Sequence, residues 1–245
     1  MTLACPRLPH WCAATLLLIA AACGGNDASN DTRGTAEPAV SAVPATPETR
    51  AGRDPSPRPD MAGGRPRVVA LGDSLTAGLG LKPEAAYPAL LQRRLDEEGV
   101  QYEVVNAGVS GDTSAGGLSR LDWALDGDVR VLIVALGGND ALRGLPVEQL
   151  RRNLSTIIER AQTRQIEVLL AGMEAPPNFG QSYTVSFHEA YADLARQYDV
   201  AFVPFLLERV AGIASLNQRD GIHPTAEGAR IVADNVWRAL RPMLQ

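Results

Sequence analysis

Cysteine is nearly missing from this chain, and it is missing entirely where a folded domain would use it. All three cysteines, Cys5, Cys12 and Cys23, lie within the first 23 of the 245 residues. The remaining sequence therefore offers no thiol for a disulfide framework, a cysteine nucleophile or a cysteine metal site.

The chain also lacks an excess of positive charge. Its 23 Lys and Arg residues stand against 28 Asp and Glu residues, which gives a formal net charge of -5. Proteins that bind a phosphate backbone concentrate basic residues on one surface, so nucleic acid is not expected as a partner. A hydrophobic fraction of 45% is ordinary for a soluble globular protein, and the length suits one large domain with appendages.

Residues 1–23 are expected to be a signal peptide, because Arg7 precedes an apolar run that ends in small residues before Cys23. The run is about a dozen residues long, which is too short to span a bilayer. The small residues before Cys23 resemble a bacterial lipobox, although Ala20 stands where such motifs usually have Leu, Val or Ile. We expect a cell-envelope lipoprotein with a lipid anchor on Cys23; cleavage to a soluble periplasmic or secreted protein is the alternative.

Residues 24–65 are predicted to be a disordered tether. They carry six prolines and no aromatic residue. Such a segment buries too little apolar surface to offset the entropy lost on ordering. The tether would join the N-terminal anchor to a folded domain of residues 66–245.

That domain alternates short apolar runs with longer amphipathic segments. The runs typical of strands are residues 67–72, 102–108, 129–137, 166–172 and 200–205. The segments typical of helices are residues 84–98, 114–125, 147–164, 183–197 and 225–241. Continuous apolar strands separated by helices indicate a single α/β domain with a parallel sheet covered on both faces. In such sheets the ligand site lies beyond the carboxyl ends of the strands.

A serine follows the first predicted strand in the motif Gly72-Asp73-Ser74. At a strand-to-helix junction its hydroxyl is presented at the sheet edge, and its own amide can stabilise an oxyanion. The alternative for this motif alone is that Asp73 or Ser74 merely caps the next turn.

Two further turns offer hydrogen-bond donors at the same edge. The turn after the second strand contains Gly108, whose amide could approach a substrate oxygen closely, and the turn after the third contains Asn139. A phosphate cradle at the first turn is disfavoured, because no G-x-x-x-x-G-K-[ST] motif is present. Taken singly, each turn could equally be an ordinary one.

An acid and a base lie ahead of the last predicted helix, in Asp220-Gly221-Ile222-His223. The spacing lets the Asp220 carboxylate reach His223 Nδ1, which leaves Nε2 to accept the proton of a serine hydroxyl. His10 falls in the leader, and His188 lies in a helical segment where a surface or packing role is expected. His223 is therefore the predicted base.

Together these four blocks resemble the SGNH (GDSL) hydrolase superfamily, with Ser74, Gly108, Asn139 and the Asp220/His223 pair in the matching positions. The similarity is greatest to bacterial esterases of the acyl-CoA thioesterase I, lysophospholipase and arylesterase type. The resemblance implies a flavodoxin-like three-layer α/β/α sandwich with a five-stranded parallel sheet. It also implies hydrolysis of acyl esters or thioesters without a cofactor or metal. The catalytic residues would be Ser74, Asp220 and His223, and the oxyanion hole would use Ser74, Gly108 and Asn139.

The segment after the fourth strand resembles that family's substrate-side loop. It contains Met173, Pro176, Asn178 and Phe179, which we expect to contact substrate. Prolines restrict the backbone, while Met173 and Phe179 offer apolar surface for an acyl chain. The alternative is a stiff connecting loop.

Three other functions stay open. One is a metal-dependent phosphoesterase built on carboxylates and a histidine, namely Asp73, Asp112, Asp140, Asp220 and His223; such centres normally need more histidines than this domain has. The second is a carbohydrate O-deacetylase of the same superfamily. The third is a non-catalytic, ligand-binding surface lipoprotein. Because one chain supplies the whole cleft, we expect a monomer.

Overall fold

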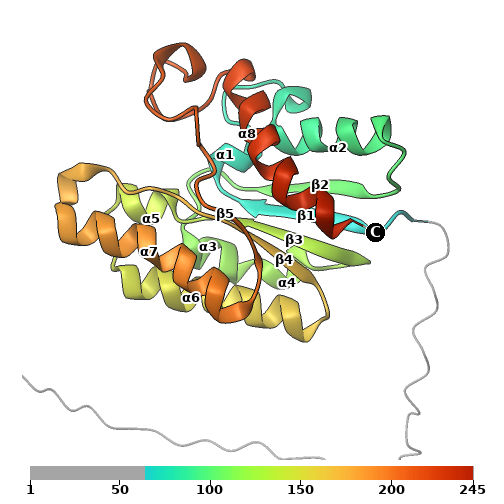
Figure 1. The fold of residues 1–245 in the computed structure, drawn as a ribbon, viewed down its shortest axis with the longest axis horizontal. Coiled ribbons are helices and arrows are strands. Elements are labelled where there is room, and N and C mark those ends of the chain that lie inside the picture. The colour runs from blue at the N-terminus through green and yellow to red at the C-terminus, as the bar shows by residue number, and fades with distance from the viewer. Residues whose placement is uncertain (1–63, 245) are drawn as a thin grey trace, which may run out of the picture. The chain divides into compact units, whose positions relative to one another are not determined.

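The computed structural model describes residues 64–244 (Figure 1). The predicted signal peptide, its Cys23 and the predicted tether up to residue 63 lie outside the described residues. Within residues 64–244, no helix combines the length and the apolar character needed to cross a membrane.

A five-stranded sheet forms the centre of the domain. Its strands are β1 (Arg67–Gly72), β2 (Glu103–Gly108), β3 (Val129–Ala135), β4 (Glu167–Ala171) and β5 (Ala201–Val203). All neighbouring pairs are parallel, and the strand order is β2-β1-β3-β4-β5. This is the flavodoxin-like order, so the predicted fold class is confirmed.

The central strands are apolar because both of their faces are covered. Residues 68–72 of β1 are all buried, and β3 has one exposed position, Arg130. The edge strand β2 is more polar, with Glu103 and Asn106 exposed. Continuous apolar runs of this kind are typical of strands buried between two helical layers.

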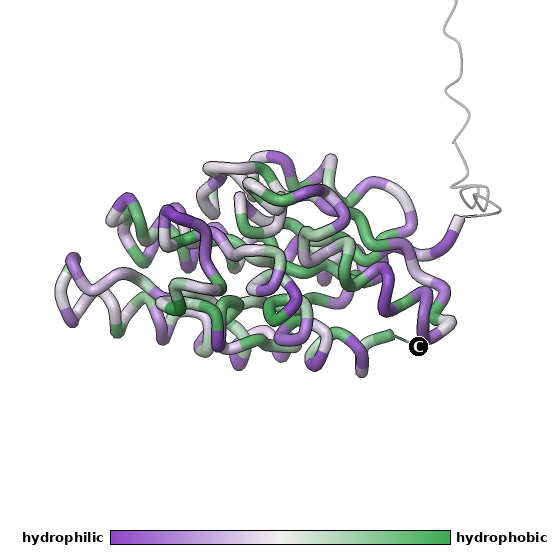
Figure 2. Tube along the Cα trace, turned by 90° about the horizontal axis from the view of Figure 1, so that it is seen from above, coloured by the Kyte–Doolittle hydropathy of each residue, from purple (hydrophilic) through white to green (hydrophobic). Residues whose placement is uncertain are grey.

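Two helical layers cover the sheet (Figure 1). On one face α2 (Tyr87–Glu97) packs against α8 (Ala226–Leu240). On the other face α6 (Val147–Thr163) packs against both α7 (Gln181–Tyr198) and α3 (Ser114–Ser119). Hydrophobic and hydrophilic residues alternate along the helical turns (Figure 2), as expected for helices with one side on a sheet.

The structure differs from the sequence prediction in detail. The helix predicted over residues 114–125 is two helices, α3 and α4 (Leu121–Ala124), because Arg120 leaves the helical conformation at φ -109° and ψ 12°. Two short helices are absent from the predicted set. They are α1 (Ser74–Ala77), which follows β1, and α5 (Gly138–Leu142), which follows β3. Single 3₁₀ turns complete the described structure, at Pro83–Ala85, Pro177–Phe179, Ala214–Leu216 and Arg241–Met243.

Candidate active site

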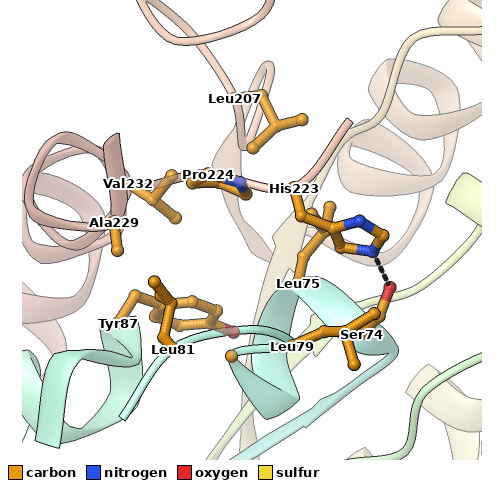
Figure 3. A pocket seen from close by; sticks show the side chains of 11 residues that line it. Ser74, Leu75, Leu79, Leu81, Tyr87, Leu207, His223, Pro224, Ala229 and Val232 are labelled. Atoms are coloured by element: carbon orange, nitrogen blue, oxygen red, sulfur yellow. Dashed lines mark hydrogen bonds between the residues drawn. The ribbon is translucent and has the colours of Figure 1, made fainter. Parts of the chain in front are cut away.

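Ser74 and His223 meet at the carboxyl edge of the sheet, where the sequence predicts the site. Ser74 opens α1 directly after β1, and His223 lies in the loop that precedes α8. The Ser74 Oγ is 2.8 Å from His223 Nε2, and Figure 3 shows the imidazole ring turned toward the hydroxyl. The other ring nitrogen, Nδ1, is 2.7 Å from Asp220 Oδ2. The three predicted catalytic side chains are therefore joined in one hydrogen-bonded series.

The Asp220 carboxylate is held in place by its own loop. Its Oδ1 accepts the backbone N–H groups of Ile222, at 2.9 Å, and His223, at 3.0 Å. These hydrogen bonds, with that from the His223 side chain, lower the pKa of Asp220 from 3.8 to about 2. An ionised carboxylate can only accept hydrogen bonds, so His223 Nδ1 must carry the proton and Nε2 is left as the acceptor for the Ser74 hydroxyl.

Asp73 fixes the start of the turn that carries Ser74. Its Oδ1 accepts the Leu75 N–H at 3.0 Å, which makes Asp73 the N-cap of α1. The carboxyl is 3% exposed. Burial raises its pKa from 3.8 to about 6, because a charged carboxylate is disfavoured away from water. Of the two residues that the sequence offered as the cap of this turn, the structure shows Asp73 in that position, and the Ser74 hydroxyl contacts His223 instead.

The two other predicted oxyanion donors both have protein acceptors in this structure. The Gly108 N–H donates to Asn106 Oδ1 at 3.0 Å. The Asn139 Nδ2 donates to the Asp112 carbonyl at 2.9 Å and to Asp73 Oδ2 at 3.3 Å. An oxyanion would have to compete with these acceptors for both donors.

A side chain at position 108 would prevent the close packing of β2 on α1. A Cβ at this position would lie 2.2 Å from the Ala77 nitrogen. The end of β2 can therefore approach α1, and hence Ser74, only if residue 108 has no side chain.

A groove of about 540 Å³ opens beside Ser74 and His223. Its polar lining residues are Asp73, Ser74, Asn139, Glu174, Asn217 and His223. Most of its wall is apolar and comes from Leu75, Leu142, Met173, Ala175, Pro176, Pro177, Phe205, Leu207, Ala211 and Ile222. A second, much smaller apolar cavity lies on the α2 and α8 side of the same pair, between Leu79, Tyr87 and Val232 (Figure 3).

The predicted substrate loop contributes only part of this groove. Met173 and Pro176 line it, whereas Asn178 and Phe179 are not among its lining residues. The Phe179 ring lies instead 5.4 Å from the ring of Tyr183. It also fills the space beside Gly144, where a Cβ would meet it at 2.6 Å.

Sequence reasoning missed the apolar groove residues that follow β3 and β5. Leu142, Phe205, Leu207 and Ile222 line the groove. Leu142 is the last residue of the short helix α5 and the other three lie in loops, so no long periodic pattern in the sequence points them toward the groove. Leu142 and Ile222 are large apolar side chains that remain 48% and 40% exposed, a property that only a structure reveals.

The carboxylates of the phosphoesterase alternative do not converge. Asp140 accepts both the N–H and the hydroxyl of Ser114, and Asp112 pairs with Arg120. Among residues 64–244, no group of three His, Cys, Asp or Glu residues is placed to hold a metal ion. His188 pairs with Glu174, with 2.6 Å between Nδ1 and Oε1, and both side chains are exposed.

A hydroxyl, an imidazole and a carboxylate joined in series at the edge of a parallel sheet form the arrangement of a serine hydrolase. The sequence profile of the GDSL-like Lipase/Acylhydrolase family matches residues 70–231. The chain belongs to this family.

Comparisons with individual proteins support the same family. The chain is 45% identical over 178 residues to "Esterase TesA" of Pseudomonas aeruginosa, an alignment that covers 72% of this chain and 89% of that protein. It is 38% identical over 178 residues to "Thioesterase 1/protease 1/lysophospholipase L1" of Escherichia coli K12, covering 72% and 84%. A crystal structure of TesA superposes with a TM-score of 0.70 at 44% identity, covering 73% of this chain and 99% of that one.

Proposed function

We propose that this protein hydrolyses carboxylic esters or thioesters of acyl groups through an acyl-enzyme on Ser74. The observation that carries the proposal is the 2.8 Å contact between Ser74 Oγ and His223 Nε2 at the mouth of an apolar groove. A serine hydroxyl is a weak nucleophile, and a neighbouring imidazole with a free acceptor nitrogen activates it.

The steps follow from the positions of the atoms. Ser74 Oγ attacks the acyl carbonyl carbon while His223 Nε2 takes the hydroxyl proton. His223 then gives this proton to the departing alcohol or thiol, and the acyl group stays on Ser74. Water, deprotonated by the same nitrogen, attacks the acyl-enzyme. His223 then returns this proton to Ser74 Oγ as the carboxylic acid leaves, which restores the starting enzyme. Asp220 stabilises the imidazolium formed in each half-reaction.

The tetrahedral intermediates place negative charge on the former carbonyl oxygen. We assign its stabilisation to the N–H groups of Ser74 and Gly108 and to Asn139 Nδ2. Gly108 would exchange Asn106 Oδ1 for the oxyanion, and Asn139 would exchange one of its two acceptors, the Asp112 carbonyl or Asp73. Because an oxyanion is charged whereas the Asn106 amide oxygen and the Asp112 carbonyl oxygen are neutral, exchanging these two acceptors favours the intermediate over the resting state. Exchange of Asp73 does so only while its carboxyl is protonated.

The groove supports acyl chains as the substrate class. Its wall is mainly aliphatic and aromatic, which suits a hydrocarbon better than a hydroxyl-rich sugar. The relatives named esterase and thioesterase 1/lysophospholipase L1 agree with acyl esters, thioesters or lysolipids as substrates. An O-acetylated sugar is retained as the comparison substrate.

The decisive test is turnover by the Ser74→Ala variant. A panel of p-nitrophenyl acyl esters, an acyl-CoA, a lysophospholipid and an O-acetylated sugar is assayed with wild type and variant. We expect kcat for accepted substrates to fall by about 10⁴–10⁶-fold, with an unchanged circular dichroism spectrum. Full turnover by a folded Ser74→Ala protein would refute the proposal.

We also propose that residues 1–23 direct export and that Cys23 carries a lipid anchor. The supporting features are the short apolar run and the small residues before Cys23. Cells producing the full chain should place it in the membrane fraction, and Cys23→Ala should release it. Equal solubility of both proteins would favour cleavage without lipidation.

A further inference from the structure

Arg120 makes three hydrogen bonds at the carboxyl edge of the sheet, although it touches neither Ser74 nor His223. Its side chain is 18% exposed. The guanidinium donates to the Gly72 carbonyl at 2.8 Å, to the Ala107 carbonyl at 2.7 Å and to Asp112 Oδ2 at 2.7 Å. The three acceptors belong to three different parts of the chain: the end of β1, the end of β2 and the loop after β2.

Two of these acceptors directly precede parts of the proposed site. Gly72 is followed by Asp73 and Ser74. Ala107 is followed by Gly108, whose amide is the second proposed oxyanion donor. The guanidinium therefore ties together the carboxyl ends of β1 and β2, the two strands that precede these proposed donors.

The third acceptor leads to the remaining donor. Asp112 pairs with Arg120 through its side chain, while its backbone carbonyl accepts the Asn139 Nδ2 hydrogen bond at 2.9 Å. Space for the Asp112 carboxylate exists because residue 116 is glycine; a Cβ there would lie 2.7 Å from Asp112 Oδ1. The Arg120 guanidinium is thus linked to all three proposed oxyanion donors. It is linked to the Ser74 and Gly108 N–H groups through one or two residues of backbone, and to the Asn139 side chain through Asp112.

We propose that Arg120 is the positioning residue of the oxyanion hole. It holds the Ser74, Gly108 and Asn139 donors in one arrangement, so that they meet the same substrate oxygen. This inference rests on the proposed function, since it concerns the oxyanion that Ser74 attack creates. Sub-ångström placement of such donors matters because their hydrogen bonds to the transition state weaken steeply when misaligned.

The geometry requires arginine and not merely a positive charge. A guanidinium presents five N–H donors in a rigid plane, and three of its nitrogens are used here. A lysine ammonium at the same place keeps the charge but cannot reach three acceptors in this plane. Arg120→Lys therefore removes the positioning while it disturbs the local electrostatics little.

The test compares Arg120→Lys and Arg120→Gln with wild type, and uses Arg151→Lys as a matched control. Arg151 is also partly buried and pairs with one carboxylate, Asp193, between α6 and α7. For each protein we would measure kcat and KM for p-nitrophenyl butyrate, the thermal midpoint, and the inhibition constant of phenylboronic acid. Phenylboronic acid bonds to the serine oxygen and places an anionic tetrahedral oxygen in the oxyanion hole.

We expect Arg120→Lys to lower kcat by about 10–100-fold and to change KM by less than about 3-fold, because the loss falls on the transition state. Boronate affinity should weaken by a similar factor. Arg151→Lys should keep kcat within about 2-fold of wild type. If Arg120→Gln does not fold, Arg120→Lys alone decides the question.

A purely structural Arg120 would give another result. Arg120→Lys would then lower the thermal midpoint, while kcat per folded molecule and boronate affinity would match wild type, and the inference would be overturned. This failure is distinct from failure of the proposed function. In the former case Ser74→Ala is still inactive, and in the latter Ser74→Ala turns over.

Discussion

The Asn139 side-chain amide donates a 3.3 Å hydrogen bond to Asp73 Oδ2, which joins the loop after β3 to the loop after β1. Asp73 is the residue before the proposed nucleophile, and Asn139 is a proposed oxyanion donor. The buried carboxyl has a pKa raised to about 6 by desolvation. The charge that holds Asn139 in its resting position is therefore itself dependent on pH.

The first prediction concerns stability and Asp73. Its folded-state pKa lies above the ordinary value of 3.8, at about 6. The folded protein thus keeps this proton at a pH where the unfolded chain has lost it. The stability that the protonated Asp73 adds to the folded state is fully present below about pH 4 and is lost as the pH rises to about 6. Asp73→Asn does not titrate, so its unfolding free energy relative to wild type should rise by about 3 kcal/mol over this window.

Urea denaturation at a series of pH values measures this difference. Asp220→Asn is the control, because the pKa of Asp220 is lowered to about 2 and its effect on stability should therefore change with pH in the opposite direction. Its carboxylate stabilises the fold above about pH 4, and that stability is lost as the pH falls toward 2. A pH-independent difference for Asp73→Asn would mean that Asp73 titrates normally in the folded state.

The second prediction concerns Asp220 and catalysis. Replacement by Asn removes the charge opposite the imidazolium and lets the amide stabilise the wrong His223 tautomer. We expect kcat to fall by about 10²–10⁴-fold. Because the pKa of Asp220 is about 2, this group stays ionised throughout the weakly acidic range. An Asp220→Asn variant that is folded and keeps the wild-type kcat at pH 7 would contradict the role given to the hydrogen bond between Asp220 and His223.

The third prediction concerns Asn139. Asn139→Ala removes one oxyanion donor and should lower kcat by about 10²–10³-fold with a small change in KM. Asn235→Ala is the matched control, because the Asn235 amide likewise donates to two acceptors, the carbonyls of Leu206 and Glu208, in the layer that contains α8. That variant should lose stability and keep its kcat. Equal kcat losses in both variants would show that Asn139 acts through the fold alone.

The fourth prediction concerns acyl-chain length. Leu142 and Phe179 are both exposed apolar side chains, at 48% and 41%, but Leu142 lines the groove and Phe179 does not. Leu142→Ala should lower kcat/KM for an octanoyl ester by about 3–10-fold through lost apolar contact and leave an acetyl ester unchanged. Phe179→Ala should change kcat/KM by no more than about 2-fold for either ester. A selective octanoyl loss in Phe179→Ala would place the acyl chain along the predicted substrate loop instead.

Much of the fold could be predicted because its signals are local. Apolar runs such as residues 67–72 become strands that are buried on both faces, and the residues that follow them share one sheet edge. Helix α8, which follows β5, packs against α2, which follows β1, and this return across the sheet brings His223 to Ser74. The short distance between these two residues therefore follows from topology together with the motifs.

Other features depend on contacts that no local pattern records. The predicted helix 114–125 breaks at Arg120, whose side chain donates to the carbonyls of Gly72 and Ala107 at the ends of β1 and β2. The hydrogen bond from Gly108 to Asn106 and the burial of Asp73 likewise arise from the packing of separate loops. For the same reason, the sequence could not separate Met173, which lines the groove, from Phe179, which packs on Tyr183.

The central claim is that His223 makes Ser74 a nucleophile, and reaction with a fluorophosphonate followed by peptide mass mapping tests it most directly. We predict a single adduct, on Ser74, whose rate of formation falls by at least about 10³-fold in His223→Gln. An adduct on another residue, or equal labelling rates for wild type and His223→Gln, would contradict the account.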